Sequence, residues 1–225
     1  MIINHKYKFI FIKTRKTAGT SIEVALSKFC GKNDIITPIS PEDEMVRKRL
    51  GYLGPQNYII RTDILNSSKK IIGKNNLVEF YNHVSAIVIK KYLNNDIWRN
   101  YYKFCFDRNP FDRVISMYFW RLKYYNENIK LKDFILNTPQ SLLSNWDLYS
   151  IDNAIAVDFV GKYENLNDDF SFIIKKIGLP GNIILPKLKS KFRNDRKHYS
   201  KIIGQKERKI IEEACFQEIQ HFSYQ

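Results

Sequence analysis

Hydrophobic residues along the chain occur in two arrangements, as short continuous runs and as longer stretches with helical spacing. Continuous runs at 7–13, 102–106 and 157–163 predict buried β-strands. Helical spacing predicts helices at 21–29, 41–50, 77–93, 109–125, 167–177 and 205–222. Strands that alternate with helices favour a parallel sheet. We therefore expect an α/β fold with a central parallel sheet flanked by helices.

Composition limits the kind of protein this chain can form. Its 225 residues, of which 44% are hydrophobic and 14% aromatic, are enough for a full core and exclude general disorder. Because no repeat or low-complexity linker is apparent, we expect a single domain over 1–225. The formal net charge of +14 favours an anionic partner, such as a nucleotide, an acidic polysaccharide, a nucleic acid or an anionic lipid.

The cysteines and the apolar runs bear on the cellular environment. Cys30, Cys105 and Cys215 are odd in number and widely spaced, which fits neither a disulfide framework nor a metal site. Cys105 lies inside a predicted strand, so we expect a buried thiol. No run is long enough for a signal peptide or a membrane-spanning helix. The expectation is a cytoplasmic protein without a membrane span.

A candidate anion site follows the first predicted strand, within FIFIKTRKTAGTS at 9–21. The apolar run stops in a basic, hydroxyl-rich turn, and a helical pattern then begins. Backbone N–H groups at a helix start have no intrahelical partner, and the helix dipole adds positive charge there. Side-chain donors come from Lys16, Thr17, Thr20 and Ser21. The segment predicts a phosphate or sulfate site, the alternative being an ordinary strand–turn–helix with a solvated lysine.

The order of residues in this turn differs from that of the usual P-loop. That motif reads GxxxxGK[ST], with its lysine after the second glycine. In this chain Lys16 precedes Gly19, and no glycine-rich stretch stands upstream. The lysine is therefore expected to approach the anion from the strand side of the turn.

A second candidate anion site lies in FCFDRNPFDRVISMYFWR at 104–121. Arg108 follows a predicted strand, at the end where open α/β sheets bind ligands. Asn109 is a suitable N-cap for the next helix, on which Arg113 and Ser116 share a face. A guanidinium with a hydroxyl suits a phosphate monoester. The alternative, a capped helix with surface arginines, leaves Arg108 and Ser116 unexplained.

At this point the sequence resembles the sulfotransferases that use 3′-phosphoadenosine-5′-phosphosulfate (PAPS). The resemblance rests on KTAGTS at Lys16–Ser21, RNPFDRVISMY at Arg108–Tyr118 and VGKYENLNDDF at Val160–Phe170, in that order. It implies a P-loop-NTPase-like sulfotransferase fold, PAPS as co-substrate and no metal. The carbohydrate-type branch is the most similar. Its Golgi members are membrane-anchored, whereas this chain resembles a soluble bacterial or viral version.

The resemblance also implies roles for individual residues. Arg108 and Ser116 correspond to the residues that hold the 3′-phosphate. Lys16 is expected at the oxygen that leaves during in-line transfer of the sulfuryl group to an acceptor hydroxyl, and we expect this hydroxyl to belong to a glycan. The residues expected around the 5′-phosphosulfate are Arg15, Lys16, Thr17, Ala18, Gly19, Thr20 and Ser21. Arg15 stands where the family often has proline, which adds charge beside the turn.

The acceptor hydroxyl needs a general base, and an imidazole suits this role near neutral pH. His83 lies in a middle segment comparable to one where several carbohydrate sulfotransferases carry a catalytic histidine. A purely structural role for this histidine is the alternative. Glu23 and Glu79 are the other candidate bases.

Two further features carry open alternatives. Basic residues at 187–201 could cover the nucleotide, bind an anionic glycan or form solvated surface. They are Lys187, Lys189, Lys191, Arg193, Arg196 and Lys197. Trp98, Trp120 and Trp146 could stack on a sugar or on adenine, although core packing accounts for each of them.

Two other classes of protein are alternatives to the sulfotransferase interpretation. An ATP-dependent, P-loop-like kinase needs the Walker order of glycine and lysine and an acidic magnesium ligand after a strand. The first is absent from the chain, and no acidic residue is a persuasive candidate for the second. A basic module that binds nucleic acid is compatible with the net charge. However, the basic residues are dispersed, and no helix-turn-helix or zinc pattern occurs, so we expect no nucleic-acid partner.

Overall fold

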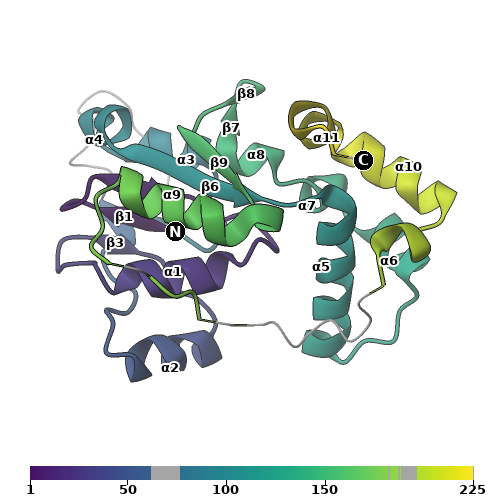
Figure 1. Cartoon of the computed structure of the whole chain (residues 1–225), viewed down its shortest axis with the longest axis horizontal. Coiled ribbons are helices and arrows are strands. Elements are labelled where there is room, and N and C mark those ends of the chain that lie inside the picture. The colour runs from purple at the N-terminus through teal and green to yellow at the C-terminus, as the bar shows by residue number, and fades with distance from the viewer. Residues whose placement is uncertain (62–76, 182, 187, 189–196, 225) are drawn as a thin grey trace.

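The computed structural model describes residues 1–61, 77–181, 183–186, 188 and 197–224. In this part of the chain a five-stranded sheet has the order β3-β1-β2-β6-β9 (Figure 1). Its strands are β1 (Ile2–Asn4), β2 (Phe9–Phe11), β3 (Ile35–Ile36), β6 (Tyr102–Asp107) and β9 (Phe159–Lys162). The pairs β2–β6 and β6–β9 are parallel, whereas β1 runs antiparallel to β2 and to β3. The expected α/β fold is confirmed, with a sheet that is mostly parallel.

Helices and two small hairpins complete the described structure. The hairpins pair β4 (Ile59–Arg61) with β5 (Leu77–Glu79) and β7 (Ser150–Ile151) with β8 (Ala154–Ile155). The helices are α1 (Gly19–Ser27), α2 (Pro41–Arg49), α3 (Ala86–Tyr92), α4 (Asn95–Asn100), α5 (Pro110–Tyr125), α6 (Leu131–Asn137), α7 (Gln140–Leu143), α8 (Trp146–Tyr149), α9 (Leu166–Lys176), α10 (Gln205–Ala214) and α11 (Phe216–Phe222), with single 3₁₀ turns η1 (Tyr163–Asn165) and η2 (Tyr199–Lys201).

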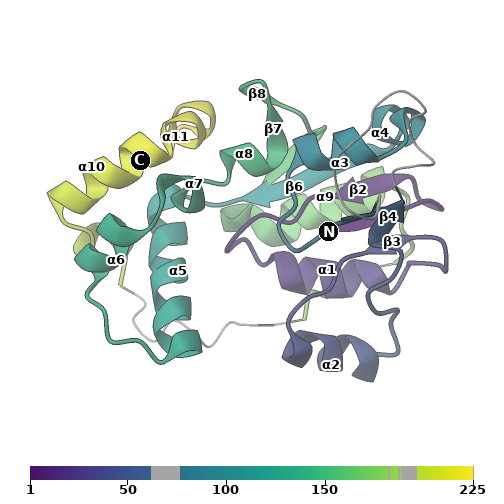
Figure 2. The same cartoon turned by 180° about the vertical axis from the view of Figure 1, so that it is seen from behind.

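Apolar residues cover both faces of the sheet. Successive strand residues point to opposite faces, so Phe9 and Phe11 pack on one side and Ile10 on the other. The phenylalanine side is covered by α1 and α9, which lie in front of the sheet in Figure 1. The other side is covered by α3 and α8, which are nearer the viewer in Figure 2. Cys105 is fully buried on that second side, as expected.

A third apolar cluster lies beyond the carboxyl ends of the strands. Here α5 packs against α6 and α10 through buried residues such as Phe111, Phe134 and Ile211. Figures 1 and 2 both show α5 standing past the tip of β6, on the side toward which the strand points. This arrangement brings a long helix to the edge of the sheet where parallel strands end.

Two helix predictions differ from the structure. The stretch 77–93 begins with β5, and only its later part forms α3, because His83 takes a left-handed backbone conformation (φ 64°) that a helix cannot contain. The stretch 205–222 is two helices that meet at Cys215. The helices predicted at 41–50, 109–125 and 167–177 are confirmed within one residue at each end. None of the helices in the described ranges combines the length and apolarity needed to span a membrane.

We predict that Gly161→Ala destabilises the protein by about 1–3 kcal/mol, because an added methyl has no room in this core. A Cβ at Gly161 would lie 2.5 Å from Cε1 of Phe106, the fully buried residue opposite it on β6. Urea unfolding measures the loss. Gly54→Ala is the matched control, since a Cβ there meets nothing within 4 Å. Equal losses in the two variants would contradict the packing argument.

Candidate functional site

The turn after β2 ends in a helix start that has no side-chain cap. Lys16 (φ 62°) and Ala18 (φ 60°) both take the left-handed conformation just before α1 begins at Gly19. The first backbone bond of the helix joins Ile22 N–H to Ala18 O at 3.1 Å, and Ala18 makes no side-chain cap. N–H groups of the first helical turn are therefore available to an anion, as the sequence pattern predicts.

Gly19 is needed because a lysine passes closely beneath it. A Cβ at Gly19 would lie 2.7 Å from Cγ of Lys13, which is buried and whose Nζ lies 2.9 Å from Oε2 of Glu23. A larger residue at this position would push the turn away from the lysine. The glycine thus allows a buried cation to lie directly under the candidate anion site.

Glu23 is a buried counter-ion rather than a base. Besides Lys13, its carboxylate faces the amino group of Met1 at 3.0 Å and Arg47 at 3.7 Å. Burial by itself would raise the pKa of Glu23, but these cations lower it to about 2. Glu79, the other carboxylate considered, is exposed on β5.

The hydroxyl groups of the turn differ in their surroundings. The hydroxyl of Thr17 is buried and lies 2.8 Å from that of Thr14, so this hydroxyl is already engaged within the turn. Ser21 is buried, and its Oγ accepts the N–H of Leu188 at 3.4 Å. Thr20 is partly exposed. Of the three predicted hydroxyl donors, Thr20 is the most open to a ligand.

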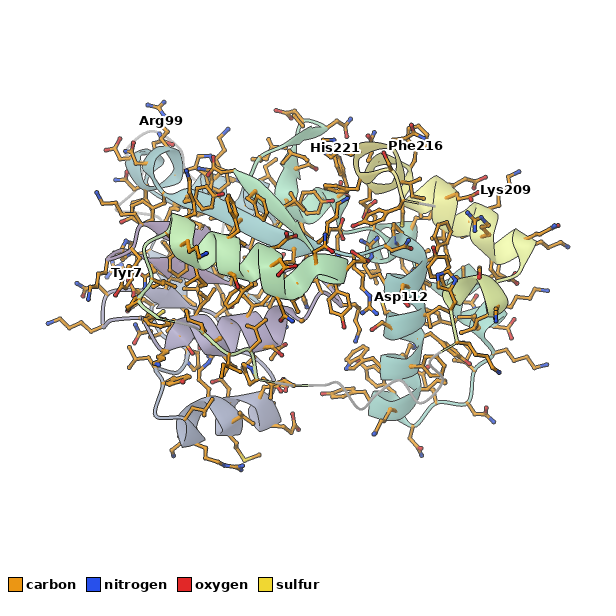
Figure 3. All side chains as sticks on the ribbon, in the orientation of Figure 1. Tyr7, Arg99, Asp112, Lys209, Phe216 and His221 are labelled. Atoms are coloured by element: carbon orange, nitrogen blue, oxygen red, sulfur yellow. The ribbon has the colours of Figure 1, made fainter. Side chains whose placement is uncertain are left out.

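Arg108 joins the second candidate segment to the first. Its Nη1 donates to the carbonyl oxygen of Lys16 at 3.1 Å, and its guanidinium lies 4.0 Å from the ring centroid of Tyr163. Its Nε and Nη2 donate to Asp112, which is labelled near the beginning of α5 in Figure 3. Asn109 caps α5 as expected, accepting the N–H of Phe111. The two segments therefore meet at one edge of the sheet.

Ser116 and Arg113 lie in different environments on α5. Arg113 is 2% exposed and pairs with Asp107 at 2.7 Å and Glu218 at 2.8 Å, so the expectation that it faces a phosphate beside Ser116 is wrong. Ser116 is partly exposed and lies four residues after Asp112, in the same row along the helix. The structure gives no hydrogen bond between Ser116 and Arg108.

Asn145 clamps the backbone of the anion turn. Its side chain accepts the N–H of Arg15 at 3.0 Å and donates to the carbonyl of the same residue at 3.1 Å. The same amide donates to Asp107 at 3.2 Å, and the backbone N–H of Asn145 donates to Glu218 at 2.7 Å. A mostly buried polar network thus connects α11, the end of β6 and the turn. Burial and the charge of Arg113 lower the pKa of Arg15.

His83 lies against the beginning of the turn. Its Nδ1 is 3.0 Å from the carbonyl oxygen of Lys13. A carbonyl only accepts, so Nδ1 carries the proton and Nε2 of the neutral ring is an acceptor. Burial, followed by the charges of Lys13 and Arg15, lowers the pKa of His83 to about 3. The backbone of His83 is left-handed, so this residue lies outside the helix α3 that begins at Ala86.

Lys16 reaches across to α5. Its Nζ lies 5.4 Å from the ring centroid of Trp120, within cation–π range. Trp98 and Trp146 are 8% and 6% exposed and pack in the core, whereas Trp120 is only partly buried. Core packing is therefore confirmed for two of the three tryptophans and not for Trp120.

The basic segment at 187–201 lies mostly outside the described residues. This holds for Lys187, Lys189, Lys191, Arg193 and Arg196, while Lys197 is exposed. On one side of the segment Leu188 contacts Ser21, and on the other Tyr199 stacks on Phe111 with ring centroids 5.5 Å apart. Its described flanks thus contact both α1 and α5.

Sequence reasoning missed the residues that hold the site together. Asp107, Asn145 and Glu218 are far apart in the chain, and none belongs to a local motif. Only Asp107 carried a signal, as an acidic residue at the end of a predicted strand.

A cavity of about 510 Å³ opens elsewhere, near Tyr7 and Lys28, at the opposite end of β2. The described residues contain no group of three or more His, Cys, Asp and Glu side chains that could hold a metal ion.

This geometry, an uncapped helix start and an arginine side by side at the carboxyl edge of a mostly parallel sheet, is typical of an α/β protein that binds a phosphorylated or sulfated ligand. The family model described as "Sulfotransferase family" matches residues 1–225. The chain belongs to the sulfotransferase family.

Two relatives show how far the similarity extends. An uncharacterized protein of Archaeoglobus fulgidus is 34% identical over 106 residues, which cover 42% of this chain and 82% of that protein. Carbohydrate sulfotransferase 8 of Mus musculus is 24% identical over 140 residues, which cover 47% of this chain and 34% of the mouse protein. No solved structure gives a match.

We predict that Asn145→Ala destabilises the protein by about 1–3 kcal/mol, because it leaves the N–H and carbonyl of Arg15 without their partner. It is also expected to weaken binding of an anionic nucleotide, since the turn loses its clamp. Urea unfolding and calorimetric titration with adenosine 3′,5′-bisphosphate measure the two effects. Asn137→Ala, at an exposed position of α6, is the control. Nucleotide binding as tight as in the unmodified protein would rule out the clamp.

Proposed function

We propose that this protein transfers the sulfuryl group of PAPS to a hydroxyl group of a glycan. The observation that supports the proposal is the hydrogen bond from Arg108 to the carbonyl of Lys16, which joins the two candidate anion-binding segments. PAPS has two anionic groups to match them, a 5′-phosphosulfate and a 3′-phosphate. The family supports sulfuryl transfer, and the glycan is supported by the name of the mouse relative and by the net charge of +14.

In this proposal the turn and the first turn of α1 hold the 5′-phosphosulfate. The backbone N–H groups of Thr17 to Ser21, including those of Ala18 and Gly19, surround the anion, and Thr20 adds a hydroxyl. Arg15 adds positive charge beside them. Arg108 and Ser116 hold the 3′-phosphate, the group that distinguishes PAPS from ATP. This assignment follows the two segments that meet at one edge of the sheet.

The reaction is a displacement at sulfur. The acceptor oxygen forms a bond to sulfur while the bond between sulfur and the bridging oxygen breaks, and that electron pair stays on the 5′-phosphate. Lys16 stabilises the charge that develops on the leaving oxygen. His83 takes the acceptor proton on Nε2, while its Nδ1–H stays bonded to the carbonyl of Lys13.

The low pKa of His83 fits the role of general base once the negative charge of bound PAPS is considered. Without a ligand, burial and nearby cations hold the pKa at about 3, so the ring is neutral and able to accept a proton at pH 7. A bound polyanion offsets the charges of Lys13 and Arg15 and so raises the pKa from this value, while burial, the larger cause, keeps it low.

A kinase remains the alternative that needs an experiment. Asp107 is the acidic residue that follows β6, but its carboxylate already accepts hydrogen bonds from Arg113, Tyr149 and Asn145. It is therefore poorly placed to hold a nucleotide-bound magnesium ion, and Lys16 precedes the glycine of the turn.

We predict that Lys16→Ala lowers kcat for transfer from radiolabelled PAPS to a chondroitin acceptor by about 100- to 1000-fold. Binding of adenosine 3′,5′-bisphosphate, which carries no sulfuryl group to transfer, is expected to weaken far less. Lys28→Ala removes the same charge at the exposed far end of α1 and is the control.

Equal losses of turnover and of bisphosphate binding would show that Lys16 contributes to binding and not to the chemical step. Absence of transfer by the unmodified protein to every acceptor of a panel, together with thermal stabilisation only by ATP with magnesium, would refute sulfuryl transfer.

We predict that His83→Asn lowers kcat by about 100- to 10,000-fold with little change in bisphosphate binding. Asparagine tolerates the left-handed backbone and keeps an N–H for the carbonyl of Lys13, but it has no basic nitrogen. Because the base must be unprotonated, activity of the unmodified protein rises with pH through the pKa of the complex, and the variant loses this dependence. A pH–rate profile of His83→Asn with normal height and shape would remove His83 from the mechanism.

A further inference from the structure

Three aromatic side chains gather at the end of α5, and we call Trp120, Tyr124 and Tyr125 the aromatic shelf. Trp120 and Tyr124 are stacked, with ring centroids 5.1 Å apart and planes at 21°. Tyr125 stands edge-on to both rings, at 5.8 Å and 5.0 Å. Together they form a continuous aromatic surface over the last turns of the helix.

Packing in the core does not account for the aromatic shelf. Tyr124 and Tyr125 are 54% and 58% exposed, and no shelf residue belongs to any of the three core clusters of the described chain. By contrast, Tyr118 on the same helix packs into the third cluster and donates its hydroxyl to Ile129 O. Exposed aromatic surface that the core does not use is a candidate binding surface.

The position of the aromatic shelf relative to the anion site is defined by α5. Asp112, Ser116, Trp120 and Tyr124 follow one another at intervals of four residues, so they lie in one row along the helix. Asp112 contacts Arg108 at one end of the row, and Trp120 contacts Lys16 further along. The row therefore leads from the candidate 3′-phosphate site, past the candidate catalytic lysine, to the shelf.

The order of residues along α5 distinguishes between adenine and an acceptor sugar as the ring that stacks on the aromatic shelf. Adenine and the 3′-phosphate belong to the same end of PAPS, and Arg108 marks that end. Tyr124 lies about 18 Å along α5 from Asp112 and about 12 Å from Ser116, given a rise of about 1.5 Å per residue. The aromatic shelf thus begins beside Lys16, one turn beyond Ser116, and extends away from the candidate 3′-phosphate site, so it suits the acceptor better than adenine.

We propose that the aromatic shelf binds the pyranose ring of the acceptor glycan, an inference that rests on the proposed function. A pyranose has an apolar face of C–H groups that packs on an electron-rich aromatic ring, while its rim of hydroxyls stays free. Lys16, with Lys123 exposed on the same helix segment, favours a sugar that carries a carboxylate or sulfate. A hydroxyl on the rim then faces the reaction centre.

The test compares acceptor kinetics with nucleotide binding. The double variant Tyr124→Ala/Tyr125→Ala and the single variant Trp120→Ala are assayed for sulfate transfer to a chondroitin tetrasaccharide. KM for the tetrasaccharide is expected to rise about ten-fold or more, with the Kd for adenosine 3′,5′-bisphosphate within about two-fold of the unmodified value. Phe216→Ala, at a 56% exposed aromatic of α11 (labelled in Figure 3), is the matched control and is expected to change neither value.

Other outcomes would overturn the proposal. An unchanged KM in both shelf variants would show that the glycan binds elsewhere. A Kd for the bisphosphate raised as much as the KM would assign the shelf to adenine. Loss confined to transfer to 4-nitrophenol, with glycan kinetics intact, would assign it to phenolic acceptors.

A second readout does not depend on turnover. Trp120 is the tryptophan that lies outside the core, so its fluorescence is expected to change when the tetrasaccharide is titrated in without any donor, and Trp120→Phe is expected to abolish that change. A fluorescence change that persists in Trp120→Phe counts against the shelf. If the unmodified protein transfers no sulfate to any acceptor yet shows this fluorescence change, the proposed function fails while glycan binding at the shelf stands.

Discussion

The parallel pairing of β2 with β6 is the constraint on which the rest of the site depends. Phe11 lies opposite Phe104, and the N–H of Ile12 continues the ladder to Phe104 O at 2.9 Å, so the two strands end at the same edge. The segments that follow them are 92 residues apart in the chain, yet Arg108 reaches the carbonyl of Lys16. An antiparallel arrangement would send the two segments to opposite edges.

Buried carboxylates lie beneath the turn at this edge of the sheet. Glu23 holds Lys13 under the anion turn, and Asp107 holds Arg113 and the clamp residue Asn145. Removing one partner from such a buried pair leaves an uncompensated charge, which costs about 3–5 kcal/mol. These pairs make the backbone of the turn difficult to displace, so its N–H groups keep their direction before any ligand arrives. A preorganised anion site of this kind needs little rearrangement during reaction.

A single helix relates the different parts of the site to one another. At its beginning α5 holds Asp112 against Arg108, and near its end Trp120 lies beside Lys16. A rigid helix positions side chains more accurately than a loop does. The distance between the candidate 3′-phosphate site and the aromatic shelf is therefore set by helical geometry, and the buried Arg113 fixes the helix to the sheet through Asp107.

Local sequence by itself determined much of this protein. The apolar runs located β2, β6 and β9, and the residues around Gly19 and Arg108 marked the two candidate anion-binding segments, because strands, caps and helix starts follow from neighbouring residues. Tertiary structure decided which charged side chains are buried in the core and which lie at the candidate site. Arg113 has the helical spacing of a partner for Ser116, but Glu218, which lies 105 residues away, holds it in the core. Trp120 resembled the core residues Trp98 and Trp146 in sequence, yet packing left it beside Lys16. Burial depends on contacts between distant segments, and no local pattern carries that information.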